Sequence, residues 1–229
     1  MAGVALMPPK NRDMARSAGE RGSVYALLAA ILRRPISPAT LRTIRLPAFA
    51  QALSQAGMEL GADFAAAAED QLLERLVIDF TQLFHGPRGH VPPFESIQTG
   101  GQGESLNARA ASRVRRFFES AGFEFNAACG ELSDHIGVEL EFMAELAHRE
   151  AGAWESGDVA ALSRCLEDQR DFLKKHLGAW GPELGRSIRD KAQSRLYRGV
   201  GQLLAAFLES ERVEIERRLE IGAAQEAAA

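Results

Sequence analysis

The chain has 229 residues, of which 46% are hydrophobic and 25% charged, a composition typical of a globular protein with one large domain or two small ones. Its formal net charge of −4 argues against general nucleic-acid binding, because such proteins carry a basic excess or a basic stripe. The sequence contains no apolar run near the length of a membrane span and no basic start of a secretory signal, so we expect a cytoplasmic protein without stable membrane insertion.

The first segments show helical periodicity. From Ser23 onward, apolar residues recur at three- and four-residue spacing until Pro35 ends the pattern. A second, shorter helix is expected over 38–55. The clearest apolar stripe of the chain runs over 69–84 and predicts a helix with one wide buried face.

Proline and glycine then interrupt the pattern over 85–103, where neither helical nor strand spacing survives. Loops of this length are uncommon inside compact domains and are often functional. Helical spacing returns over 104–121, and a second irregular piece covers 122–130.

A strong helix is predicted over 131–154. Ser133 is its expected N-cap, and Asp134 beside it favours the positive end of the helix dipole. The remaining expected elements are a helix from the cap Asp158 to about 177, a break over 178–185, and helices over 186–208 and 211–221.

The chain therefore reads as all-α, with about eight to ten helices in a bundle-like arrangement, because no segment alternates as a strand does. The proline-rich and glycine-rich loop 85–103 is the expected hinge. It would join an N-terminal helical part, 17–121, to a C-terminal helical part, 131–222.

Motifs of catalytic or redox sites are incomplete. Cys129 and Cys165 lie far apart and are expected to be free thiols of a reducing compartment. The glycine-rich run 100–105 lacks the lysine and the preceding strand of a phosphate-binding loop. Neither Ser96 nor Ser105 stands in a Gly-x-Ser-x-Gly elbow. No catalytic residue is predicted.

Histidine and glutamate side chains within 131–154 leave a metal-dependent helical enzyme open as the alternative. Glu145 and His148 have the spacing of a di-iron ligand pair, but the chain has no second pair of this kind. His135 and Glu139 are four residues apart and share one helix face. In this alternative the four side chains together hold the metal.

Three blocks of sequence stand out for their order. The first is an aromatic-x-x-Leu-Phe run that leads through Gly-Pro and Pro-Pro to Glu-Ser: Phe80, Leu83, Phe84, Gly86, Pro87, Pro92, Pro93, Glu95 and Ser96. The second leads through Asp-His to Glu-Leu-Glu-Phe-Met: Glu131, Asp134, His135, Glu139, Leu140, Glu141, Phe142 and Met143. The third comprises Phe172, Leu173, His176, Leu177 and Trp180. Over roughly residues 20–210 these blocks resemble the TorD/DmsD/NarJ family of redox-enzyme maturation chaperones, with Ser133 where that family commonly has proline.

The resemblance implies a single cytoplasmic chaperone domain over 1–229 that is not an enzyme, with no cofactor and no metal. Such chaperones bind the apo catalytic subunit of a molybdopterin oxidoreductase of the dimethyl sulfoxide reductase group. Many also bind its twin-arginine leader, assisting cofactor insertion and holding back premature export. Members are monomers or homodimers, some of them domain-swapped. Nucleotide binding has been proposed for relatives, but no site for it can be placed in this sequence.

A leader-binding site needs carboxylates for two guanidinium groups and an apolar groove for the stretch that follows. We expect Asp134 and His135 to make the main contacts, because they open a helix beside an irregular segment. Glu141 and Glu145 are equally consistent with a solvated helix face. The other expected site residues are the acids Glu131 and Glu139, the aromatic residues Phe80, Phe84, Phe94 and Phe142, and the loop residues Pro92, Pro93, Glu95 and Ser96.

Overall fold

A computed structural model describes residues 9–55, 57–58, 60–86, 89–100, 104–123 and 132–227 of the chain. These residues form helices joined by turns, and the extended backbone pairing among them is a single bridge between Phe94 and His135. The predicted all-α class is confirmed. The helices are α1 (Pro9–Arg33), α2 (Pro38–Arg45), α3 (Pro47–Gln55), α4 (Ala62–Ala66), α5 (Glu69–His85), α6 (Glu95–Thr99), α7 (Glu104–Ser120), α8 (Ile136–Ser156), α9 (Val159–Lys175), α10 (Leu177–Lys191) and α11 (Arg195–Glu226).

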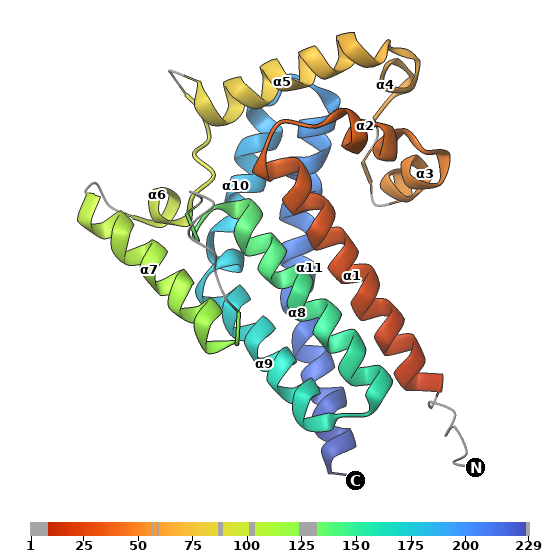
Figure 1. Cartoon of the computed structure of the whole chain (residues 1–229), viewed down its shortest axis with the longest axis vertical. Coiled ribbons are helices and arrows are strands. Elements are labelled where there is room, and N and C mark those ends of the chain that lie inside the picture. Colours follow the sequence, from red (N-terminus) through yellow and green to blue (C-terminus); the bar gives the residue numbers. More distant parts are fainter. Residues whose placement is uncertain are drawn as a thin grey trace.

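Long helices lying side by side make up the body of the molecule (Figure 1). Helix α1 packs along α8, α9 contacts both α8 and α11, and α10 packs against α11. Helix α5 lies across one end of this bundle, with α2 to α4 beside it, and α6 and α7 flank the side near α10 (Figure 1). One apolar core runs through these layers, and a smaller cluster lies between the lower halves of α1, α8 and α9.

No helix in the described part of the chain combines the length and the apolar character that crossing a bilayer requires.

Proline and serine set the boundaries of the N-terminal helices. Ser37 caps α2, because its Oγ accepts a hydrogen bond from the backbone N–H of Thr40 at 3.1 Å. The single helix expected over 38–55 is divided into α2 and α3 at Leu46, whose ψ of 134° is extended. The cause is Pro47, since the residue before a proline is pushed out of the helical region.

Helix α8 begins at Ile136, so the predicted start at 131 and the predicted cap at Ser133 are wrong. His135 is the N-cap, and its Nδ1 accepts a hydrogen bond from the N–H of Gly137 at 3.0 Å. The Ser133 hydroxyl instead donates to the carbonyl oxygen of Ala111 on α7, at 2.8 Å. The predicted cap at Asp158 is confirmed: its Oδ1 accepts from Ala161 N at 2.9 Å and begins α9.

The break expected over 178–185 is wrong, because α10 continues through Pro182. The glycines of this stretch serve helix packing and not a loop. A Cβ at Gly185 would lie 2.6 Å from the carbonyl oxygen of Gly201 and 2.9 Å from the nitrogen of Ala205, both on α11. Small residues therefore let the two helix backbones approach closely. The two helices expected over 186–208 and 211–221 are the end of α10 and the single helix α11.

The predicted loop 85–103 contains the short helix α6. Residues 87–88 and 101–103 lie outside the described residues, as does the irregular piece 124–131. A hinge at this loop, and a division of the domain into parts 17–121 and 131–222, therefore stay predictions.

Candidate functional site

The start of α8 and the start of α6 are joined through Asp134, which is fully buried. Its carbonyl oxygen accepts a hydrogen bond from Glu95 N at 2.9 Å, and its Oδ2 accepts from Ser96 N at 3.1 Å. One residue pair further, the carbonyl oxygen of Pro93 accepts from Ile136 N at 2.9 Å. The Asp134 carboxylate thus caps α6 and fixes the segment 92–99 against α8.

Behind this segment, polar side chains from different helices meet inside the core. His176 Nδ1, at the junction of α9 and α10, lies 3.0 Å from Glu95 Oε2. On α10, Trp180 Nε1 donates to Glu139 Oε2 at 3.2 Å. All four side chains are buried. They link α6, α8 and α10 at one point of the fold.

The charge state of Glu139 follows from this environment. Burial raises the pKa of its carboxyl well above the ordinary value, the charges of Glu95 and Asp134 raise it further, and the Trp180 hydrogen bond opposes the shift. A strongly raised carboxyl pKa inside a polar cluster is common at functional sites, because the groups gathered there disfavour a further negative charge.

The same segments also carry aromatic and exposed apolar side chains. The rings of Phe94 and His135 lie edge to face with centroids 5.1 Å apart, and both residues are half-buried. Next to them along the chain, Ile97 is 48% exposed and Leu132 is 55% exposed. We call these four residues the α6–α8 face. Large exposed apolar side chains beside a rigid buried support are a feature of binding surfaces.

The structure brings most of the predicted site residues together. Pro92, Pro93, Glu95 and Ser96 lie on the segment before and within α6, which packs on Asp134, His135 and Glu139. Glu131 lies outside the described residues. Contact of any of these residues with a client stays a prediction.

The predicted aromatic lining is placed differently. Phe80 and Phe84, both on α5, pack against each other in the core, with ring centroids 4.7 Å apart. Phe142 is buried between Phe118 and Phe172. None of the three lines an open groove in this conformation, because apolar residues in register with a helix stripe are more strongly drawn into the core.

The residues of the metal-enzyme alternative do not come together. His135 and His148 are more than three turns apart on or beside α8, about 20 Å along its axis, whereas ligands of one ion lie about 2 Å from it. Glu145 is exposed and forms an ion pair with Arg149. Throughout the described ranges, His, Cys, Asp and Glu form no group of three with metal-binding geometry.

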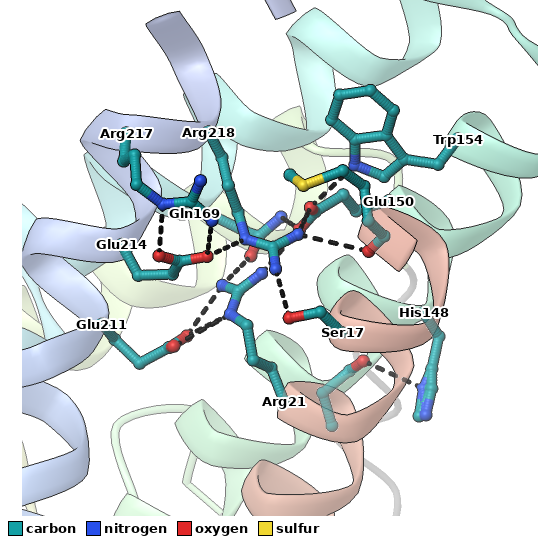
Figure 2. A network of polar contacts seen from close by, with 12 residues as sticks. Ser17, Arg21, His148, Glu150, Trp154, Gln169, Glu211, Glu214, Arg217 and Arg218 are labelled. Atoms are coloured by element: carbon teal, nitrogen blue, oxygen red, sulfur yellow. Dashed lines mark hydrogen bonds and ion pairs between the residues drawn. The ribbon is translucent and has the colours of Figure 1, made fainter. Parts of the chain in front are cut away.

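Sequence reasoning missed a second buried polar cluster, in the half of the bundle where α8 ends (Figure 2). At its centre is Glu150, which is fully buried and accepts hydrogen bonds from side chains of α1, α8, α9 and α11. These donors are Arg21 Nη1 at 2.7 Å, Trp154 Nε1 at 3.0 Å, Gln169 Nε2 at 3.0 Å and Arg218 Nη1 at 2.5 Å.

The network extends beyond Glu150 to a second buried acid. Arg21 donates to Glu211 through Nε and Nη2, at 2.8 and 2.7 Å, in a bidentate pair (Figure 2). Arg218 also donates to Ser17 Oγ at 2.6 Å. Two buried guanidinium groups thus face two buried carboxylates, so the charges balance.

Arginines decide the ionisation of Glu150. Burial alone would raise the pKa of its carboxyl, but Arg21 and Arg218 bring the pKa below the ordinary value. One signal in the sequence pointed to this residue: Glu150 continues the apolar spacing of Met143 and Ala147 and so lies on the buried face of α8. Its partners come from other helices and leave no such signal.

Comparisons with known proteins show a family and several relatives to which the chain is similar. A family model described as nitrate reductase delta subunit matches residues 46–185. A TorD chaperone of Vibrio cholerae is 30% identical over 145 residues, which is 63% of each chain. A TorD chaperone of Vibrio parahaemolyticus is 23% identical over 199 residues, 82% of this chain and 91% of the relative. A selenate reductase assembly chaperone of Thauera selenatis is 35% identical over 94 residues, 40% of this chain and 47% of the relative. The chain thus spans about 63% of the length of the Vibrio cholerae relatives it matches.

Proposed function

This chain belongs to the nitrate reductase delta subunit family, and on that premise we propose that it is a maturation chaperone for the catalytic subunit of a molybdopterin oxidoreductase. The family resemblance predicted from the sequence is confirmed. The relatives are named as chaperones and not as enzymes, which supports a role in recognition without catalysis.

In finer terms, we propose that the protein acts in the cytoplasm on the apo form of its client. It binds the catalytic subunit, its twin-arginine leader, or both, and holds export back until the cofactor is inserted. The observation that carries this proposal is the α6–α8 face, because Ile97 and Leu132 stay exposed beside a buried hydrogen-bonded support. An apolar surface of this kind suits the apolar stretch of a leader or an unfinished segment of the client.

The buried acids take a different part in this proposal from the one predicted. Asp134, Glu95 and Glu139 are buried in this conformation, so we assign to them the placing of segment 92–99. Contact with the client is assigned to the exposed side, to Ile97, Leu132 and His135. This division agrees with the energetic rule that apolar anchors supply most of the binding free energy of an interface.

The first experiment identifies the client. Tagged protein is captured from the native host grown anaerobically, and the bound proteins are identified by mass spectrometry. Enrichment of one molybdoenzyme catalytic subunit is the expected result. A synthetic peptide of that subunit's leader and the apo subunit itself then serve as the probes for titration.

Replacing Ile97 and Leu132 by serine should weaken binding of these probes at least tenfold. Each large apolar side chain contributes about 1.5–3 kcal/mol when fully buried, and about 1.4 kcal/mol equals tenfold in affinity. Isothermal titration calorimetry measures the change. Val213→Ser is the matched control, because Val213 is 72% exposed on α11 and outside the α6–α8 face. Equal affinity of the double variant and the control would contradict the placement of the site.

A further inference from the structure

Two carboxyl groups face each other inside the site described above. Glu139 lies on α8 and is fully buried, and Glu95 lies at the start of α6 and is also buried. The Glu95 carboxyl acts on Glu139 both as a like charge and as a hydrogen-bonding partner, and both effects raise the pKa of the Glu139 carboxyl. Glu139 Oε2 already accepts from Trp180. No N–H or O–H group of the described residues reaches Oε1.

A hydrogen bond between two carboxyl groups requires a proton, because an ionised carboxylate can only accept. Two ionised carboxylates that face each other in surroundings that exclude water would repel each other, as in other sites where two acids share one proton. A single proton removes both difficulties. It supplies the donor that a hydrogen bond between the two carboxyls requires and leaves only one negative charge on the pair.

We propose that Glu95 and Glu139 share one proton, and that this carboxyl pair is a pH-sensitive latch holding segment 92–99 against α8 and α10. Glu95 anchors the segment, and Glu139 with Trp180 anchors the pair to the bundle. Loss of the proton places two like charges between α6 and α8, which weakens the attachment of the segment.

The neighbouring charges support this assignment. Asp134, on the segment before α8, adds a further negative charge that disfavours ionisation of Glu139. His176 faces Glu95 from the junction of α9 and α10. Arg33, on the helix packed along α8, forms an ion pair with Glu141. Burial raises the pKa of the Glu139 carboxyl most, Glu95 and Asp134 raise it further, and the Trp180 N–H opposes them.

The sign of the pH effect follows from linkage. A carboxyl whose pKa is raised on folding keeps its proton in the folded state after the unfolded chain has lost it. The stabilisation by the latch is thus fully present below the ordinary glutamate pKa of about 4.3 and is lost as the pH rises through the pKa of the folded state. Within that window the folding equilibrium constant falls by up to about tenfold for each pH unit.

The decisive variant is Glu139→Gln, because its amide accepts from Trp180 and donates permanently to Glu95. Urea unfolding of the wild-type chain and the variant is measured from about pH 5 to about pH 9, a range that lies above the ordinary pKa of glutamate. We expect the free energy of unfolding of the variant to increase relative to that of the wild type as the pH rises. The difference should reach a plateau once the wild-type pair has lost its proton. Glu145 is exposed on the same helix. The curve of unfolding free energy against pH for Glu145→Gln should therefore run parallel to that of the wild type. Parallel curves for Glu139→Gln would overturn the proposal.

A second measurement needs no variant. The infrared spectrum of the wild-type protein at neutral pH should contain the carbonyl band of a protonated carboxylic acid that resists exchange, and its absence would also overturn the latch. The inference deepens the proposed function, since segment 92–99 carries Ile97 of the α6–α8 face. Both tests of the latch use the free protein. A negative result in them contradicts the latch, whereas unchanged client binding by the Ile97 and Leu132 double variant contradicts the proposed binding site.

Discussion

Replacing Glu150 by alanine is expected to lower the free energy of unfolding by about 3–5 kcal/mol, the usual cost of removing one partner from a buried ion pair. The side chain accepts four hydrogen bonds and faces two guanidinium groups, Arg21 and Arg218. Without it, Arg218 keeps Ser17 and Glu214 as partners, but the cluster holds an unbalanced buried positive charge. Since whole domains have about 5–15 kcal/mol of stability, this loss is a large share.

Urea unfolding followed by circular dichroism checks this expectation. Glu150→Gln keeps the shape but places an amide N–H₂ where only acceptors fit, so it should lose most of the same free energy. Glu145→Gln is the matched control on α8: its ion pair with Arg149 is solvent-exposed and worth less than about 0.5 kcal/mol. A loss under about 1 kcal/mol in Glu150→Gln would mean that the network does not depend on its charge balance.

Replacing Gly185 by alanine should destabilise the protein by about 1–3 kcal/mol, and replacing it by leucine should cost more. The added Cβ would meet the carbonyl oxygen of Gly201 and the nitrogen of Ala205. Both are backbone atoms of α11, so no side-chain rotation relieves the contact and α10 must move away from α11. Thermal or urea unfolding measures the loss.

Gly152 provides the control for Gly185. It also lies inside a helix, but a Cβ there would meet no atom within 4 Å. Gly152→Ala should therefore stabilise the protein by about 0.5–1 kcal/mol, because alanine loses less backbone entropy in a helix. The expected result is that alanine lowers the free energy of unfolding at Gly185 and raises it at Gly152. Similar effects would show that Gly185 is not a close-packing position.

Local signals in the sequence were sufficient for several helices. The predicted bounds 69–84 and 104–121 differ by one residue from α5 and α7, and the cap Asp158 begins α9 as expected. These elements depend on apolar spacing and caps within a single turn, which can be read without knowledge of neighbours.

Errors arose where tertiary contacts decide the local structure. The glycines of α10 have poor helix propensity, but Gly181 and Gly185 leave room for α11, and this packing cannot be read from the local sequence. The first half of α1 was not predicted, because its buried face carries Ala18 and Arg21 in place of an apolar stripe. One of the partners of Arg21 is Glu211, 190 residues away.

Several residues of the site could be predicted from the sequence, but their burial and their contacts could not. Glu95, Asp134 and Glu139 stood out in the sequence, and the structure brings them together on α6 and α8. Their burial could not be inferred, since an acid at a helix start is exposed in most proteins. The exposed apolar residues Ile97 and Leu132 carried no signal, because single apolar residues on a surface are common.

The network around Glu150 also bears on how the protein is made. Arg21 leaves the ribosome early in synthesis, but its acceptor Glu211 follows 190 residues later, and Arg218 is made later still. Chains emerge at about 5–20 residues per second, so α1 waits roughly 10–40 s for these partners. During that interval its charged side chain has no counterpart from α11. The nascent chain thus completes this network only after α11 has been synthesised, and until then the acceptors of α11 cannot balance the charge of Arg21.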